Sequence, residues 1–218
     1  MNHIISFAAF ALSIAYTLQG DLSRAIEYAE LGIKKSTTIA ERIWAQSGLQ
    51  WAHARIGDPN LGVDLGKNLA LMYRAAHFVP GEAFTLITTA EAIFRSGDKD
   101  DAAKECSEGL ELAERAGMKF VIGRGHRLLG KITLEMNREM AADHFSKAIS
   151  VLEEIGAENE VALACADYGR LYRDGGNIPQ ARKYLTHALE IFVRLGTLIE
   201  PDRVREELAG LPFSETQN

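Results

Sequence analysis

A tight turn that recurs about every 40 residues is the feature that most constrains how this chain can fold. Each copy contains a glycine or an asparagine next to a polar residue, and a small residue follows about five positions later in most copies. A fixed period of this length predicts a stacked array of similar units, because a single unit cannot bury its apolar face alone. The turns are Gly20-Asp21, Gly57-Asp58, Gly97-Asp98, Asn137-Arg138 and Gly176-Asn177.

The last copy shows what the turn connects. After Gly176-Asn177, Pro179 suits the first turn of a helix, and Ala181, Leu185 and Phe192 recur at helical spacing on one face. Each unit is therefore expected to be a pair of helices, with Gly117, Gly156 and Gly196 ending three of the second helices. The expected first helices are 3–18, 40–56, 82–95, 121–135 and 159–174, and the expected second helices are 22–35, 60–77, 99–116, 139–155 and 179–195.

The unit resembles a tetratricopeptide repeat. That family places Leu-Gly and then Tyr in the first helix, and Ala followed by a large residue in the second. The fourth unit has Leu129-Gly130, Ala141 and Phe145 at these places, and the last unit has Tyr168-Gly169, Tyr172, Ala181 and Leu185. The period near 40 exceeds the usual period of about 34, and the closing proline is missing. Longer units of this kind are similar to the C-terminal repeats of multidomain bacterial adenylate/guanylate cyclase or ATPase signalling proteins.

The resemblance implies an all-α fold, a right-handed α-solenoid of about five helix hairpins. The expected repeat array covers residues 1–199, in units of about 1–38, 39–78, 79–118, 119–157 and 158–199. Residues 200–218 are expected to form a capping helix near 201–209 and a frayed polar tail from Ser214 to Asn218.

Composition and charge narrow the function classes. The net charge of −6 argues against general nucleic-acid binding, which needs a basic surface. Cys106 and Cys165 are the only cysteines, so a reducing cytoplasm is expected. The apolar run Ile4–Leu18 falls short of the roughly 20 residues of a membrane span, and we expect a buried first helix instead.

No pattern in the sequence predicts catalysis, a cofactor or a metal. Residues Gly125–Lys131 match the G-x-x-x-x-G-K part of a phosphate-binding loop, but Ile132 stands where Ser or Thr should bind magnesium. The six histidines are scattered, and the carboxylates follow helix surfaces in runs such as Glu105, Glu108 and Glu111. The chain is therefore expected not to be an enzyme, and both cysteines are expected at packing positions.

A partner-binding groove is expected on the first helices, since these line the concave surface of tetratricopeptide arrays. One interpretation is an aromatic anchor zone beside a clamp for acidic groups; the other is that the aromatic residues pack internally and the basic residues pair with carboxylates of the next unit. The aromatic residues are Phe7, Phe10, Trp44, Trp51 and Phe84, and the basic residues are Arg124, Arg127, Lys131, Arg170 and Arg173.

The leading hypothesis is a non-catalytic interaction or scaffolding module that holds a protein or peptide segment, in the regulatory C-terminal region of a larger bacterial signalling protein. A small-ligand sensor that regulates an attached enzyme is one alternative. Self-association is another, because the first helix is apolar nearly all round between Ile4 and Ala15.

Overall fold

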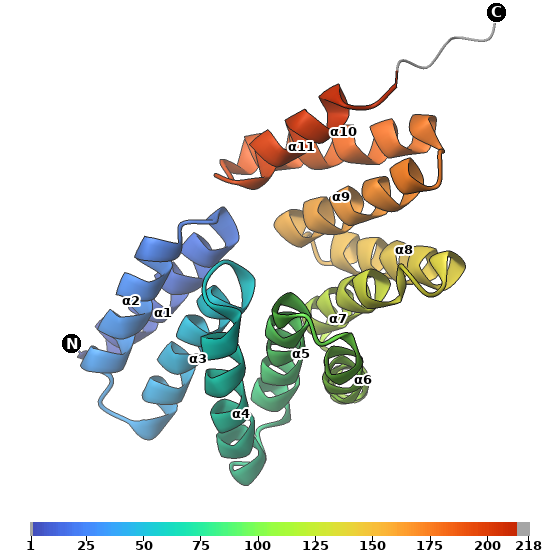
Figure 1. The fold of residues 1–218 in the computed structure, drawn as a ribbon. Helices are drawn as coiled ribbons and strands as arrows, with labels where there is room; N and C mark the ends of the chain where they lie inside the picture. Colours follow the sequence, from blue (N-terminus) through green and yellow to red (C-terminus); the bar gives the residue numbers. More distant parts are fainter. Residues whose placement is uncertain (1, 213–218) are drawn as a thin grey trace, which may run out of the picture. The chain divides into compact units, whose positions relative to one another are not determined.

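The computed structural model describes residues 2–212, and these residues form eleven α-helices and no strand (Figure 1). The predicted tail from Ser214 to Asn218 lies outside the described residues. The helices are α1 (Asn2–Gln19), α2 (Leu22–Lys35), α3 (Ile39–Arg55), α4 (Pro59–Ala75), α5 (Val79–Ser96), α6 (Lys99–Arg115), α7 (Lys119–Thr133), α8 (Arg138–Glu154), α9 (Glu158–Asp174), α10 (Ile178–Leu195) and α11 (Glu200–Ala209). The all-α fold class is confirmed, and each helix begins and ends within a few residues of its predicted bounds.

The repeated turn works through helix capping. Asp or Asn precedes every even-numbered helix from α2 to α10, and its side chain accepts a hydrogen bond from a backbone N–H in the first turn. Such a cap stabilises a helix by about 1 kcal/mol. Gly20, Gly97 and Gly176 provide the left-handed backbone that ends the helix before the turn. The capping residues are Asp21, Asp58, Asp98, Asn137 and Asn177.

Small residues let the two helices of a hairpin approach closely. Ala25, Ala102 and Ala181 are fully buried at the predicted positions. Gly62 takes this place in α4, where a Cβ atom would lie 2.9 Å from the backbone nitrogen of Ala54. The small-residue positions of the repeat are therefore packing positions.

The chain divides into two compact units between Val121 and Ile122. In unit 1, which precedes this point, α1 packs against α2 and α3, and α5 packs against α3, α4 and α6. In unit 2, which follows it, α9 packs between α8 and α10, and α11 packs on α10. Val204 of α11 is fully buried, as expected for a helix that covers its neighbour.

The first helix, α1, is apolar over most of its length. Among residues 2–212, no helix has the combination of length and apolarity that a bilayer crossing requires. Ser6, Ala9, Ser13 and Thr17 form the buried face of α1. The large apolar residues of the helix are therefore not its buried face, and Ile4 and Phe7 are exposed.

Candidate functional site

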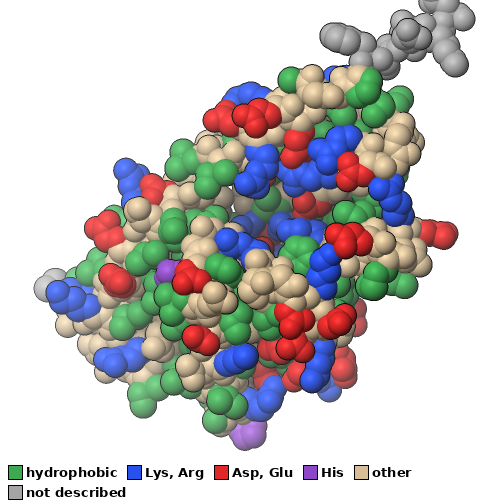
Figure 2. Space-filling view, viewed as in Figure 1, with side chains coloured by type: hydrophobic (Ala, Val, Ile, Leu, Met, Phe, Trp, Pro, Cys, Tyr) green, Lys and Arg blue, Asp and Glu red, His purple; other side chains and the backbone are tan. Residues whose placement is uncertain are grey.

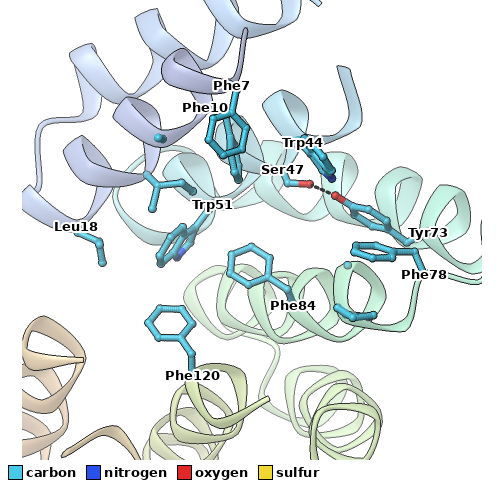
Figure 3. Close-up of a pocket in the computed structure, with 14 residues that line it drawn as sticks. Phe7, Phe10, Leu18, Trp44, Ser47, Trp51, Tyr73, Phe78, Phe84 and Phe120 are labelled. Atoms are coloured by element: carbon cyan, nitrogen blue, oxygen red, sulfur yellow. Dashed lines mark hydrogen bonds between the residues drawn. The ribbon is translucent and has the colours of Figure 1, made fainter. Parts of the chain in front are cut away.

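An aromatic cavity of about 710 Å³ lies in unit 1 among α1, α3, α4, the α4–α5 connection, α5 and the start of α7 (Figure 3). Eight of the fourteen lining residues are aromatic, and none carries a formal charge at neutral pH. Cavities of about 300–1,000 Å³ with apolar walls are typical of binding sites. The aromatic lining residues are Phe7, Phe10, Trp44, Trp51, Tyr73, Phe78, Phe84 and Phe120, and the others are Ala11, Ile14, Leu18, Ser47, Pro80 and Gly81.

All five aromatic residues that the sequence singled out line this cavity. Phe7 and Phe10 come from α1, while Trp44 and Trp51, seven residues apart, come from one face of α3. The sequence reasoning missed Tyr73, Phe78 and Phe120 because they lie outside the predicted first helices. The signal that could have found Phe78 is an aromatic residue in a connection, immediately before Val79-Pro80 at a helix start.

The cavity has an exposed rim and a buried floor. Phe7, Trp44 and Phe78 are 59%, 38% and 45% exposed, whereas Trp51 is 2% exposed. The Trp51 ring packs edge-on against Phe84 and Phe120, with ring centroids 5.3 and 6.2 Å apart. These contacts fix the floor of the cavity in place.

Two hydroxyl groups are paired at the edge of the cavity. The Ser47 hydroxyl lies 2.9 Å from the Tyr73 hydroxyl and donates to the carbonyl of Ile43 at 3.0 Å, so Tyr73 is the donor to Ser47. Burial raises the pKa of Tyr73 above its usual value, although the Ser47 hydrogen bond opposes this effect. The phenol therefore stays neutral, and the cavity offers an occupant little beyond apolar contact.

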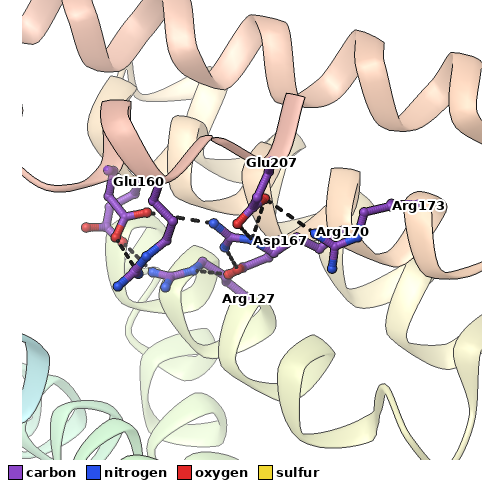
Figure 4. Close-up of polar contacts among 8 residues, drawn as sticks. Arg127, Glu160, Asp167, Arg170, Arg173 and Glu207 are labelled. Atoms are coloured by element: carbon purple, nitrogen blue, oxygen red, sulfur yellow. Dashed lines mark hydrogen bonds and ion pairs between the residues drawn. The ribbon is translucent and has the colours of Figure 1, made fainter. Parts of the chain in front are cut away.

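The basic residues that the sequence predicted belong to unit 2, where they meet carboxylates (Figure 4). The Arg127 guanidinium lies 2.8 Å from Asp167 and 3.5 Å from Glu160. Arg170 lies 2.8 Å from Asp167 and 3.0 Å from Glu207. The two pairs of Arg127 and the Arg170–Glu207 pair reach the next repeat or the capping helix, as in the second interpretation of the sequence, whereas the Arg170–Asp167 pair lies within α9.

The 40-residue period explains how these charges meet. Arg127, Asp167 and Glu207 occupy equivalent places one period apart, on α7, α9 and α11, and Arg170 links the last two. Burial alone raises the pKa of Asp167, but the positive charges of Arg127, Lys131 and Arg170 outweigh this effect and hold that pKa well below its usual range. Asp167 is therefore ionised at neutral pH, and opposite charges meet along the series of ion pairs called the ladder below, which consists of Arg127, Asp167, Arg170 and Glu207.

The remaining basic residues have different environments. Arg124 is buried, whereas Arg173 is partly exposed and lies 2.8 Å from Asp174 and 3.8 Å from Glu207. Figure 2 shows Lys and Arg side chains interspersed with Asp and Glu side chains on the visible face of unit 2. Arg127, Arg170 and Arg173 therefore have acidic neighbours, while the five aromatic residues that the sequence singled out lie in the other unit.

Several glycine, cysteine and histidine residues that were considered for phosphate binding, nucleophilic catalysis or metal binding pack against other side chains. Gly130 of the G-x-x-x-x-G-K stretch packs on Phe145, which a Cβ atom would approach to 2.7 Å. Burial raises the pKa of the Cys165 thiol to about 12, so it is protonated and a poor nucleophile. His126 and His144 meet with their Nδ1 atoms 3.1 Å apart, but among residues 2–212 no group of three His, Cys, Asp or Glu side chains could hold a metal ion.

Comparison with known proteins gives the fold. No protein-family model matches the sequence, and no curated protein matches it. Among solved structures, aspartyl phosphate phosphatase F from Bacillus subtilis superposes with a TM-score of 0.68 at 14% identity, over 94% of this chain and 55% of the other. A Pyrococcus horikoshii signal transduction ATPase with a tetratricopeptide repeat sensor gives 0.61 at 14% identity, over 96% of this chain and 37% of the other.

In a third superposition, the match extends over almost the whole of the other protein. A putative kinesin light chain from Podosopora anserina, with nearly identical TPR-like repeats, gives a TM-score of 0.56 at 14% identity, over 89% of this chain and 97% of the other. This chain spans only about half of the phosphatase and about a third of the ATPase. These likenesses establish a fold of tetratricopeptide-like helical repeats, which confirms the resemblance seen in the sequence.

Proposed function

We propose that this TPR-like chain is a non-catalytic protein-interaction module, and that the aromatic cavity of unit 1 holds an apolar segment of a protein partner. The observation that carries the proposal is the aromatic lining, open at its rim, with Phe7 and Trp44 exposed above the buried Trp51. Aromatic residues around a buried centre are typical of the few positions that dominate the affinity of protein interfaces.

The cavity is a better candidate than the basic residues of unit 2. An acidic partner that approached Arg127 or Arg170 would have to displace Asp167 or Glu207 from short ion pairs. Breaking a buried ion pair by removing one member costs about 3–5 kcal/mol. The apolar cavity carries no such cost, and its rim is already accessible to a partner.

We further propose that the module serves a larger bacterial signalling protein in the cytoplasm, where partner binding regulates an attached domain. Support comes from the ATPase of similar fold, whose repeats are described as a sensor and of whose length this chain covers 37%. A partner captured in the cavity would then be the signal that the larger protein detects.

Self-association is a second candidate function, and the exposed face of α1 favours it. Ile4, Ala8, Leu12 and Ala15 form an exposed apolar stripe at helical spacing. Such a stripe is a surface that a second copy could cover. Light scattering on the Ile4→Glu/Leu12→Glu variant separates the two functions: a wild-type dimer that becomes a monomer supports self-association, and a wild-type monomer at high concentration excludes it.

Capture from bacterial lysate tests the proposed function. The wild-type chain is compared as bait with Phe7→Glu/Trp44→Glu, which charges the rim of the cavity. Ile39→Glu/Leu71→Glu is the matched control, since these residues are exposed and apolar but do not line the cavity. The proposal predicts a protein that the wild type and the control retain and the rim variant loses, with unchanged circular dichroism. Equal capture by all three baits would refute it.

A further inference from the structure

We infer that the segment held in the aromatic cavity is an α-helix with an uncharged apolar face; this inference rests on the proposed function of unit 1. It names the chemistry of the partner, which the proposed function leaves open. Three features of the cavity lead to it: the hydrogen-bonding groups of its walls, the charges around it and its volume.

The walls offer few hydrogen-bonding groups to an occupant. They are built mainly from α1, α3 and α5, whose backbone N–H groups bond within each helix beyond its first turn. Apart from the tryptophan indoles, the polar lining groups are the hydroxyls of Ser47 and Tyr73, which bond to each other. The cavity therefore lacks the free strand edge that binds an extended peptide through its backbone.

An extended segment would bring its own backbone polar groups into this apolar space. Each residue carries one N–H and one C=O group, and burying such groups without partners is unfavourable. A helix pairs these groups internally and presents only side chains, at spacings of i, i+3 or i+4, and i+7. The shortage of partners in the walls therefore selects a helical occupant.

The charges around the cavity select an uncharged face. On the helices that line it, Glu41 and Glu82 are already engaged, and the Arg55 guanidinium lies over the Trp51 ring, 5.6 Å from the ring centroid. Glu41 pairs with His3 and accepts a hydrogen bond from the backbone N–H of Thr37 at 2.7 Å. Glu82 lies 2.7 Å from the Arg74 guanidinium. A charged side chain in the cavity would lose its hydration and find no charged group in the lining, so electrostatic complementarity requires a neutral apolar face.

The volume and the lining set the size of the anchors. About 710 Å³ is enough for several large side chains. Three anchors at i, i+3 or i+4, and i+7 extend about 10.5 Å along a helix. Leu, Met and Phe are the natural anchors because aromatic walls make favourable contacts with aliphatic, thioether and aromatic groups.

Tryptophan fluorescence gives a reporter that is specific for this cavity. Trp44 and Trp51 are the only tryptophans of the chain, and both line it. The probes are tryptophan-free amphipathic peptides of about 16 residues, long enough for helix formation on binding, with Leu, Met or Phe at the three anchor positions. Two controls accompany each peptide: one has a central proline that breaks the helix, and one has Lys at the middle anchor.

The inference predicts that at least one helical peptide shifts the tryptophan emission of the full chain. Its proline and lysine controls should bind at least about tenfold more weakly. Phe7→Glu should weaken binding of the helical peptide, whereas Leu71→Glu, exposed outside the cavity, should not. Octanol, as a small uncharged apolar probe, tests whether the cavity selects small molecules instead.

Three outcomes would overturn the inference. They are equal binding of a helical peptide and its proline control, binding of octanol with no response to any peptide up to about 1 mM, and no response to any probe. None of these results affects capture from lysate that depends on the rim of the cavity. The proposed function fails separately, when the rim variant captures the same proteins as the wild type.

Discussion

Asp167→Asn should destabilise the chain strongly, because Asp167 joins two arginines in the buried ladder of unit 2. Its carboxylate lies 2.8 Å from Arg127 and 2.8 Å from Arg170. The Asp167 side chain is 9% exposed and that of Arg127 is 10% exposed. The substitution keeps the shape of the side chain and removes its charge, so the two guanidinium groups lose their shared counter-ion.

The structure sets the size of the effect. Removing one member of a buried ion pair costs about 3–5 kcal/mol, because the remaining charge is left buried without compensation. Arg127 retains Glu160 at 3.5 Å and Arg170 retains Glu207 at 3.0 Å. We therefore expect the lower end of that range, about 3 kcal/mol. Asp202→Asn is the control, since Asp202 pairs with Arg205 on the surface and such pairs contribute less than about 1 kcal/mol.

Urea unfolding followed by circular dichroism measures the difference. A double-mutant cycle with Arg127→Met isolates the pair, and we expect a coupling free energy of at least about 1 kcal/mol. The pH dependence gives a second readout. The folded pKa of Asp167 lies below the unfolded value of about 3.9, so its stabilisation is present above that pH and is lost as the pH falls. Asp167→Asn should therefore lose less stability than the wild type between pH 5 and pH 3. Equal destabilisation by Asp167→Asn and Asp202→Asn would refute the reasoning.

Two further predictions concern packing and histidine protonation. Gly66→Ala should lower the free energy of unfolding by about 1–3 kcal/mol, because its Cβ atom would lie 2.1 Å from the Thr89 hydroxyl. Gly210→Ala is the control and should change the free energy of unfolding little, because its Cβ atom would have its nearest contact at 3.5 Å. Similar urea midpoints for the two variants would contradict this prediction. Burial, the nearby His144 and Lys147 lower the pKa of His126 to about 4. The folded state, in which the His126 ring is neutral, should therefore lose about 1–3 kcal/mol of stability as the pH falls from about 6.5 to 4. His126→Phe should reduce that loss, as measured by urea unfolding at each pH. The same pH dependence in the variant and the wild type would contradict this prediction.

Most of the fold could be predicted because its determinants are local. Asp21, Asp98 and Asn177 cap the helices that follow them, and glycines next to them end the preceding helices. Such signals lie within a few residues of one another, so a single sequence shows them. The turn after α4 differs from these turns, because His77 adopts the left-handed backbone conformation that glycine adopts in other turns.

The aromatic part of the site was only partly predictable. Trp44 and Trp51 are seven residues apart, which places them on one helix face in any helical context. Phe120 follows the turn at Gly117 and reaches Trp51 across nearly 70 residues of chain, through tertiary packing that no local pattern encodes. The cavity therefore depends on how the helices pack, and the sequence alone does not predict it.

The partners of the basic residues were also hidden in the sequence. A run of amino acids shows the charge of Arg127 but not which carboxylate faces it. The one available signal was the period itself, since Asp167 and Glu207 stand one and two periods after Arg127. Reading the sequence at that interval would have shown a carboxylate at the equivalent place of α9 and of α11, and hence candidate partners for the arginines of α7 and α9.

Site-specific photo-crosslinking tests the central claim most directly, namely that a protein partner occupies the aromatic cavity of unit 1. A photoreactive phenylalanine analogue replaces Phe7 at the rim in one variant and Leu71, which is exposed outside the cavity, in the other. The claim predicts that irradiation in bacterial cells joins one protein to the chain from position 7 and not from position 71. The same adducts from both positions, or none from position 7, would contradict it.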